Sequence, residues 1–277
     1  MTGATIYGLY LLAGVVAGLV SGLFGLGGGL TIVPALTVAL PLQGVGPEHV
    51  MHLAIGTSLA VMFFTALYTT VLRNRHGDLN WPLFWHLLPA VAFGTAVGAF
   101  AGGFLPGPIL RVSFVGFVAY MLIRALHRHY RKPRNLGASD RSDSVPVMPS
   151  RVSRLVSGIT TGLTGALLGA GAAVITVPYL QAAGYRIQTA SAIAAALSAV
   201  IGMGAGAGYA LGGLGVTALP AGAFGYLYLP AFAGMTAGAL VGSPLGVRIS
   251  HRMKEPTQFR LFLAYLTVVL ISMMVPG

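Results

Sequence analysis

Long apolar runs separated by short polar stretches make up most of the sequence. Most of these runs have about the 20 residues that a helix needs to cross a bilayer, and two of them are considerably longer. The pattern predicts an all-α, polytopic membrane protein of about eight hydrophobic segments. The predicted segments are residues 5–40, 50–72, 84–104, 108–126, 153–183, 187–212, 222–247 and 258–275.

A polar and basic stretch interrupts this series at residues 127–152. It contains Pro and Ser, and its composition is typical of a flexible linker. We therefore expect two repeats of four segments each, residues 1–126 and residues 153–277, joined by this linker.

Matching motifs in the two halves indicate an internal repeat. Their common order matters more than any single match, because Gly/Ala-rich helices resemble each other by composition. The glycine ladders within them are typical of close helix packing. Gly25–Pro34 matches Gly169–Pro178, Ala54–Leu59 matches Ala192–Leu197, Pro89 with Gly94, Gly98 and Gly102 matches Pro230 with Gly234, Gly238 and Gly242, and Arg111 matches Arg260.

Positive charges favour one of two topologies. If all segments cross the membrane, the repeats are parallel and the 16 Lys and Arg residues divide ten to six between its sides. If residues 5–40 and 153–183 each enter and return on one side, the repeats are inverted and only Arg111 is separated from the other basic residues. Cytoplasmic loops carry the excess of Lys and Arg, which favours inverted repeats with broken first helices, a common plan of transporters. Linker 127–152 is then cytoplasmic.

Composition narrows the classes of function. The chain is 56% hydrophobic and only 8% charged, which excludes an ordinary soluble domain. Its net charge of +11 comes from basic residues between apolar runs, so a nucleic-acid partner is not expected. The five acidic residues lie in loops or at segment edges. Cation transporters and proton pumps usually place a carboxylate within the membrane, so an anionic or neutral substrate is favoured.

Motifs for catalysis or metal binding are missing from the sequence. It has no Cys and no H-E-x-x-H motif, and Ser21 lacks the G-x-S-x-G context of a hydrolase. We therefore predict neither an enzyme nor a metal or cofactor site. His52, near the end of an apolar segment, is a candidate for proton coupling because histidine titrates near neutral pH; a packed interfacial histidine is the alternative interpretation.

Gly25–Pro34 is the most informative motif. Each glycine in it disfavours a helix by about 1 kcal/mol relative to Ala, and Pro34 removes a backbone donor. A break in the helix is therefore expected. Free N–H groups at membrane depth are tolerated only when they are buried in protein or line a wet cavity, and a helix N-terminus attracts anions. The motif predicts either an anion-binding cradle of backbone N–H groups or close helix packing.

Thr57 and Ser58 follow a glycine in the second segment. Their hydroxyl groups are interpreted either as donors to an oxyanion or as partners of a carbonyl one turn earlier in the helix. The equivalent residues of the second half are Ala195 and Ala196, with Ser198 nearby. A binding site here would therefore be chemically asymmetric.

Together these motifs resemble the TauE/SafE family, which contains sulfite and organosulfonate exporters of bacterial inner membranes. The resemblance rests on GLFGLGGGLTIVP in the first segment, AIGTSLAV in the second, the proline and glycine pattern of the third, and the degenerate second copy. It spans about residues 6–275. It implies a multi-pass inner-membrane transporter that exports a small sulfur oxyanion, such as sulfite, sulfoacetate or a related organosulfonate, and we expect alternating access around the broken helices.

The resemblance also implies which residues bind the substrate. In the second half Ala172 and Ala173 replace Gly28 and Gly29, so one half is expected to carry most of the binding. The small anion and the lipid bilayer are the expected partners, and a homodimer stays open. Transport of another anion, such as a carboxylate or thiosulfate, and a non-transporting membrane scaffold are the alternatives. The implied substrate-binding residues are Gly25, Gly27, Gly28, Gly29, Thr31, Pro34, Thr57, Ser58, Gly169, Gly171, Thr176 and Pro178.

Overall fold

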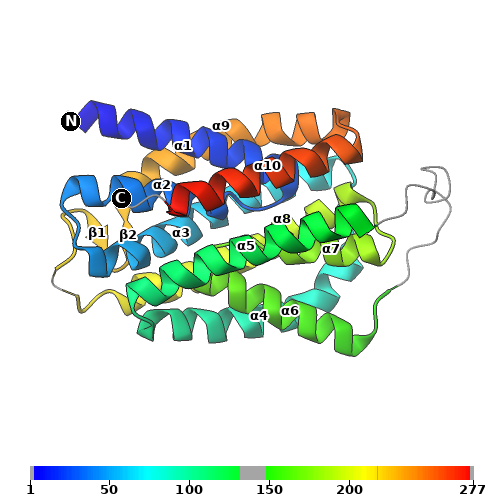
Figure 1. The fold of residues 1–277 in the computed structure, drawn as a ribbon, viewed down its shortest axis with the longest axis horizontal. Coiled ribbons are helices and arrows are strands. Elements are labelled where there is room, and N and C mark those ends of the chain that lie inside the picture. Colours follow the sequence, from blue (N-terminus) through cyan, green and yellow to red (C-terminus); the bar gives the residue numbers. More distant parts are fainter. Residues whose placement is uncertain (1–2, 132–147, 217, 275–277) are drawn as a thin grey trace.

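The computed structural model describes residues 3–131, 148–216 and 218–274. Nearly all of them are helical (Figure 1), which confirms the prediction of an all-α, polytopic membrane protein. The elements are α1 (Gly3–Phe24), α2 (Gly29–Ala39), η1 (Pro41–Gln43), α3 (Pro47–Arg75), α4 (Trp81–Phe104), α5 (Gly107–Arg131), α6 (Arg151–Leu168), α7 (Ala173–Ala182), α8 (Ile187–Gly212), β1 (Ala223–Phe224), β2 (Leu227–Tyr228), α9 (Leu229–Arg252) and α10 (Glu255–Met274).

The first predicted segment, residues 5–40, is broken into α1 and α2, as its glycine motif predicts. Gly25, Gly27 and Gly28 lie in the break with φ angles of 77°, 67° and 84°. Only glycine occupies this region without strain, so the sequence itself determines where α1 ends. The fifth predicted segment is broken in the same way, between α6 and α7.

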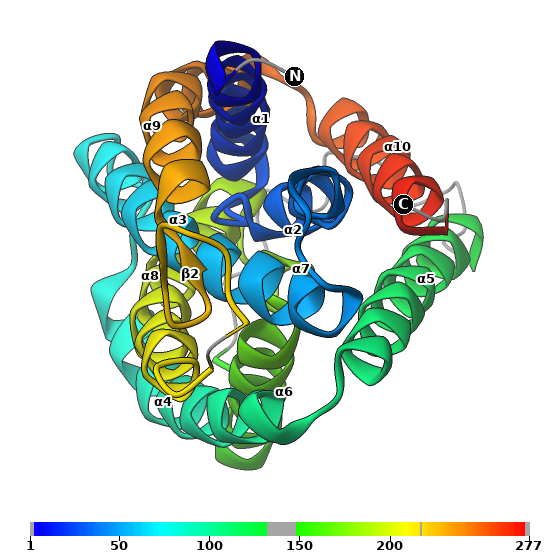
Figure 2. The same ribbon diagram turned by 90° about the vertical axis from the view of Figure 1, so that its left-hand side faces the viewer.

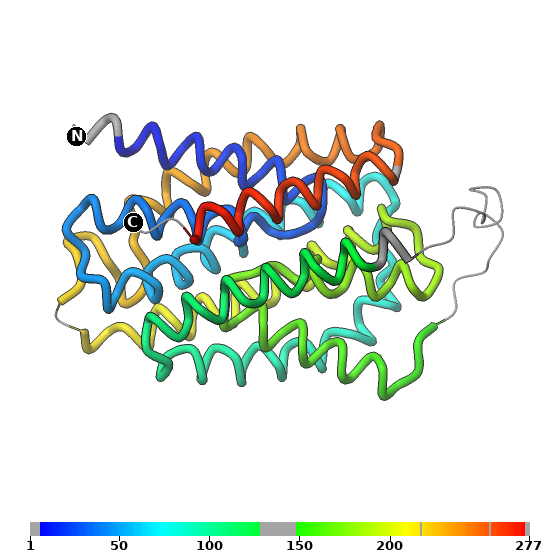
Figure 3. The backbone as a smooth tube through the Cα atoms, viewed as in Figure 1, coloured from blue at the N-terminus to red at the C-terminus, as the bar shows by residue number. Residues whose placement is uncertain are grey.

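Each broken segment forms a hairpin. Gln43, which follows α2, donates a hydrogen bond to the Tyr10 hydroxyl near the start of α1. In the second half, Ser153 near the start of α6 donates to the hydroxyl of Tyr179 near the end of α7 at 3.1 Å. The chain therefore returns to the end of the bundle from which each hairpin started, and the two hairpins open at opposite ends (Figure 3).

Helix length and composition identify the membrane spans. Among the described residues, the seven helices α1, α3, α4, α5, α8, α9 and α10 are long and apolar enough to cross a bilayer. Helices α2 and α7, the returning arms of the two hairpins, are too short to do so. Helix α6 carries Arg151 and Arg154 in its first turn. Because the first and fifth of the eight predicted segments are each broken in two, the described residues form ten α-helices.

The seventh predicted segment, residues 222–247, begins later than its apolar run indicates. Strands β1 and β2 pair in an antiparallel hairpin in front of α9, which begins at Leu229. Gly222 and Gly225 adopt positive φ angles around this hairpin, and Pro230 lies in the first turn of α9. Glycine conformation and proline placement thus override hydrophobicity and start the helix seven residues later.

Helix pairs recur between the two halves. Helix α1 packs along α9 and α6 packs along α4, so the first helix of each half contacts the ladder helix of the other half. Helices α3 and α8 cross in the core, and α5 contacts α10. Gly94 and Gly98 face the backbone of α6, while Gly238 and Gly242 face that of α1, so closely that a Cβ would overlap a neighbouring atom. The glycine ladders therefore serve helix packing, as predicted.

Basic residues gather at one end of the bundle, which we call the basic end. There α3, α5 and α9 end and α4, α6, α8 and α10 begin (Figures 1 and 3). Every described Lys and Arg except Arg111 belongs to these helix ends or to the connections between them. Figure 2 looks onto the opposite end, where α1 begins and the β1–β2 hairpin lies. Residues 132–147 of the predicted linker lie outside the described residues.

Candidate functional site

The two helix breaks meet inside the bundle. We call residues 25–28 and 169–172 the glycine turns. Gly171 of the second turn lies against the carbonyl of Leu26 in the first turn, and Gly29, just after the first turn, lies against the carbonyl of Gly169 in the second. A Cβ on either glycine would overlap the carbonyl that it faces. The absence of side chains at these two positions therefore allows the two halves to touch backbone to backbone.

Ser58 of α3 joins the two glycine turns. Its hydroxyl lies 3.2 Å from the carbonyl oxygen of Gly29 and 3.4 Å from that of Gly169, so that it donates to either one. The side chain is fully buried. Both acceptors belong to other segments, so this predicted site residue lies between the two halves.

Ser198 of α8 makes the matching connection from the second half. Its hydroxyl accepts a hydrogen bond from the N–H of Ala172 at 2.8 Å and donates to the carbonyl of Gly25 at 3.4 Å. Sequence reasoning placed Ser198 near the site without assigning it a role. The signal for its role was its position. The residues of α8 that are equivalent to Thr57 and Ser58 are both alanine, and Ser198, two residues beyond the equivalent of Ser58, is the next residue with a hydroxyl group.

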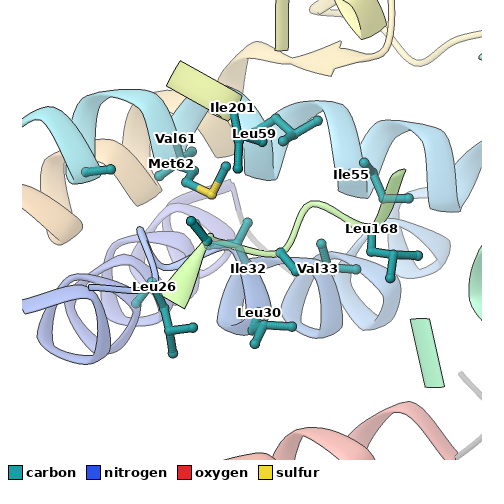
Figure 4. Close-up of a cluster of buried hydrophobic side chains, with 14 of the residues drawn as sticks. Leu26, Leu30, Ile32, Val33, Ile55, Leu59, Val61, Met62, Leu168 and Ile201 are labelled. Carbon is teal, nitrogen blue, oxygen red and sulfur yellow. The ribbon is translucent and has the colours of Figure 1, made fainter. Parts of the chain in front are cut away.

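Apolar side chains pack around the glycine turns. Figure 4 shows Leu26 and Val33 of the first hairpin segment below Leu59 and Met62 of α3, with Ile201 of α8 beside them. All five side chains are fully buried, as are both serines. The conformation described here is therefore closed around the turns.

The helices that begin at the two turns are capped differently. Gly28, the N-cap of α2, has a φ of 84°, whereas Ala172, the N-cap of α7, has a φ of −61°. Alanine avoids the left-handed region, so the replacement of Gly28 by Ala172 changes the path of the second turn. At both turns the first amides of the new helix lack an acceptor within that helix, and partial positive charge faces the turn.

The helices that end at the two turns are also capped differently. Arg73 of α3 donates from Nη2 to the carbonyls of Gly22 and Leu23 at 2.7 and 3.3 Å. In the second half, the hydroxyl of Tyr209 donates to the carbonyl of Leu167 at 3.4 Å. The negative end of α1 thus meets a full positive charge, and that of α6 meets a neutral group. Sequence reasoning used Arg73 only as a topology signal, because its carbonyl partners are distant in the sequence.

Other predicted site residues lie apart from the contact between the turns. The Thr57 hydroxyl accepts a hydrogen bond from the N–H of Tyr228 at 2.9 Å, which ties α3 to the β1–β2 hairpin. The Thr31 hydroxyl lies 3.0 Å from that of Tyr265 and thus bonds to α10. Pro34 lies within α2, and Thr176 and Pro178 lie within α7.

His52 lies towards the opposite end of the bundle, about 9 Å along α3 from Ser58 by helical rise. Its Nε2 is 3.0 Å from the carbonyl oxygen of Leu105, and its ring stacks on Tyr226 with centroids 4.8 Å apart. The structure therefore does not bring His52 together with the glycine turns. In the described part of the chain, no three His, Asp or Glu side chains gather in a way that would hold a metal ion.

A hydrogen-bonded chain of side chains covers the opposite end of the bundle. The Tyr228 hydroxyl donates to Oε1 of Gln43 at 2.8 Å, and Nε2 of Gln43 donates to the Tyr10 hydroxyl. Burial raises the pKa of Tyr228, which keeps its hydroxyl protonated as a donor. These contacts link the first hairpin to the β1–β2 hairpin above α3.

The sequence matches the family model described as "Sulfite exporter TauE/SafE" over residues 10–274. The chain belongs to the TauE/SafE family. Both glycine turns, Ser58 and Arg73 of this TauE/SafE chain fall within the matched region. The match confirms the resemblance that the glycine motif and its second copy indicate.

Three relatives of this TauE/SafE chain are named as probable membrane transporter proteins. The protein of Haemophilus influenzae is 29% identical over 266 residues, which cover 96% of this chain and 97% of the relative. That of Methanocaldococcus jannaschii is 26% identical over 264 residues, which cover 92% of this chain and 90% of the relative. YunE of Bacillus subtilis is 25% identical over 185 residues, which cover 62% of this chain and 66% of the relative. No solved structure matches this chain significantly. The family assignment and these relatives identify the chain as a membrane transporter rather than an enzyme.

Proposed function

We propose that the chain exports a small sulfur oxyanion, such as sulfite, sulfoacetate or a related organosulfonate, by alternating access. The two glycine turns hold the anion while the halves of the protein rock around it. The proposal is carried by one observation, the meeting of two broken segments whose helices α2 and α7 both begin at the turns. Free N–H groups at these helix starts favour an anion over a cation.

Hydroxyl groups supply further donors at this place. Ser58 and Ser198 bond to backbone groups of the turns in the closed conformation. When the turns separate, both hydroxyls are free to donate to an oxyanion in place of the carbonyls. Opening towards either end then exposes the same donors in turn, as alternating access requires.

The two hairpins and the basic end support an inverted repeat with the basic end in the cytoplasm of a bacterial inner membrane. The α1–α2 hairpin opens at the opposite end and the α6–α7 hairpin at the basic end. Basic residues concentrate on the cytoplasmic side of membrane proteins. Linker 127–152 is then cytoplasmic, and anions gather at this face before they enter.

Export of an anion needs no coupling ion. A membrane potential that is negative inside favours the exit of each negative charge by about 2.3 kcal/mol per 100 mV. Proton coupling would add to this driving force, and His52 is the first residue to test for it. A His52→Gln variant that keeps pH-dependent flux would exclude this histidine from coupling.

Flux measurements with purified protein in liposomes test the substrate. The panel consists of sulfite, sulfoacetate, thiosulfate and acetate, with sulfite handled without oxygen, under a potential set with valinomycin and potassium. Sulfite or sulfoacetate should move faster through protein-containing liposomes than through protein-free ones. Preferential flux of thiosulfate or acetate would assign another anion to the same site, and no flux of any anion would favour a membrane scaffold.

Two glycine variants test the role of the turns. Gly28→Leu places a bulky side chain at a φ of 84° next to Ala17, so it should abolish flux without preventing membrane insertion. Gly116→Leu is the matched control, because Gly116 on α5 is exposed and a Cβ there meets no atom within 4 Å. Normal flux through the Gly28 variant would refute the proposed anion site.

A further inference from the structure

Arg73 is a buried cation whose charge is only partly balanced. Of the Lys, Arg, Asp and Glu side chains among the described residues, that of Arg73 alone is fully buried, with 0% exposure. Its ion pair with Asp78 is loose, with 3.6 Å between Nη1 and Oδ2. The same carboxylate oxygen lies 2.9 Å from Nε2 of His251. Buried charges are costly unless they are well paired, so the position of Arg73 calls for a functional reason.

Capping of a helix does not provide that reason. The carbonyl of Leu23, at the end of α1, is equivalent to that of Leu167 at the end of α6. A neutral phenol, that of Tyr209, donates to the second carbonyl, whereas the guanidinium of Arg73 donates to the first. The second half shows that this fold caps the helix without a charge.

One buried polar atom of Arg73 and one of Gln258 lack hydrogen-bond partners. Arg73 and Gln258 both donate to the carbonyl of Leu23, at 3.3 and 2.7 Å, and both approach Oγ of Ser250, at 3.3 and 3.2 Å. The two side chains are therefore neighbours. Nε of Arg73 has no acceptor and Oε1 of Gln258 has no donor. Because buried polar groups are nearly always paired, this pair of atoms indicates a ligand that both accepts and donates.

We propose that Arg73, Ser250 and Gln258 form a receiving site for the exported anion at the basic end, before it reaches the glycine turns. The proposal rests on the proposed export function and adds a second site to it. The oxygens of a sulfur oxyanion, whether sulfite or a sulfonate, would accept from the guanidinium of Arg73. Hydrogensulfite, which keeps one hydroxyl, would in addition donate its O–H to Oε1 of Gln258. An incoming anion takes over the weakly held place of the Asp78 carboxylate.

Polar groups connect this site to the first glycine turn. Arg73 contacts the carbonyl of Gly22, three residues before Gly25. The hydroxyl of Ser191 is buried without a hydrogen-bond partner, and the backbone of the same residue packs against Gly25. Ser198 then bonds to the carbonyl of Gly25. An anion released by Arg73 therefore meets hydroxyl groups along the way to the turns.

Concentration dependence of sulfite flux tests the receiving site. Arg73→Gln keeps a neutral donor for the α1 carbonyls but removes the charge, so KM for sulfite should rise roughly 10- to 100-fold, the range of a lost charge-assisted hydrogen bond. Arg73→Lys should give a smaller rise because it keeps the charge without the fork. Arg75→Gln, an exposed arginine on the same helix, is the matched control and should leave KM unchanged. A purely structural Arg73 predicts wild-type KM in every variant that folds.

Chemical labelling of the wild-type protein gives a second, independent readout. Phenylglyoxal should modify Arg73 slowly, as the basic end opens, and sulfoacetate should protect Arg73 but not Arg75 from modification, as measured by mass spectrometry. Absence of selective protection at Arg73, or of any modification there, refutes the receiving site even where Arg73→Gln fails to fold.

The two proposals fail in different ways. If the wild type moves sulfite and Gly28→Leu does not, while Arg73→Gln has the KM of Arg75→Gln, the glycine-turn function stands and the receiving site is refuted. If the wild type moves no anion but sulfoacetate still protects Arg73, the receiving site stands as an anion site and the export function is refuted.

Discussion

Gly171→Ala tests whether the two halves touch backbone to backbone at the glycine turns. Gly171 is not among the glycines with positive φ, so alanine fits its backbone conformation. The new Cβ, however, would overlap the carbonyl of Leu26, a backbone group that cannot rotate away. Overpacking of this kind costs about 1–3 kcal/mol, and the reduced freedom of the unfolded chain returns about 0.4–1 kcal/mol. Values near the middle of these two ranges give a net loss of about 1–2 kcal/mol.

Thermal unfolding in detergent measures this loss. For a chain of this size, a change of about 1–2 kcal/mol corresponds to an apparent Tm that is roughly 2–8 °C lower. Gly116→Ala is the control, since its Cβ meets open space on a helix and should raise stability by up to about 1 kcal/mol. Sulfite flux through the Gly171 variant should also fall, because about 1–2 kcal/mol disfavours the closed arrangement roughly 5- to 30-fold.

The result that would refute this reasoning is a Gly171→Ala protein with the Tm and flux of the Gly116→Ala control. The turns would then be too far apart for a methyl group to matter. Such an outcome would remove the contact between the two halves on which the closed conformation depends.

Further predictions concern the hydroxyl groups and the orientation in the membrane. Ser198→Ala leaves a buried N–H unpaired and should cost about 1–3 kcal/mol, more than Ser58→Ala, which removes only a donor to carbonyls; equal shifts in thermal unfolding would contradict this order. Thr57→Val removes the acceptor of a β2 amide, so hydrogen exchange should accelerate in the β1–β2 hairpin, and unchanged exchange would show that this bond does not hold it. The chain has no Cys, so Leu42→Cys and Arg252→Cys, both exposed and at opposite ends, report topology: an impermeant maleimide should label only the former in intact cells, and labelling of the latter alone would reverse the proposed orientation.

Local sequence signals were sufficient for most of the fold. Apolar runs of the right length predict the membrane helices, because a span must satisfy its backbone within itself. Gly25, Gly27 and Gly28 predict the first break, because their backbone conformation is open to glycine alone. The start of α9 was misplaced by its apolar run, since the β1–β2 hairpin before it is itself made of apolar residues.

The candidate site was less accessible from the sequence, since its key contacts join distant segments. Ser58 was identified because it follows the glycine of a repeated motif. Ser198 and Arg73 were not assigned roles, because each depends on a partner in another segment: Ala172 and Gly25 for the serine, and the end of α1 for the arginine. The sequence around Ser198 or Arg73 does not indicate which backbone group of another segment its side chain will contact.

The unequal capping of the two broken helices bears on the proposed selection of an anionic substrate. At each glycine turn one helix ends and another begins, so the partial charges of the two helix dipoles oppose each other. The carbonyl ends of α1 and α6 therefore weaken the positive field of the amide ends at the turns. Arg73 changes this balance at the first turn, because a full charge neutralises the end of α1 and leaves the positive start of α2 uncompensated. Tyr209 brings no such charge to the second turn. The charge of Arg73 therefore lies on the side of the first turn that faces the basic end, where the proposed receiving site would admit an anion.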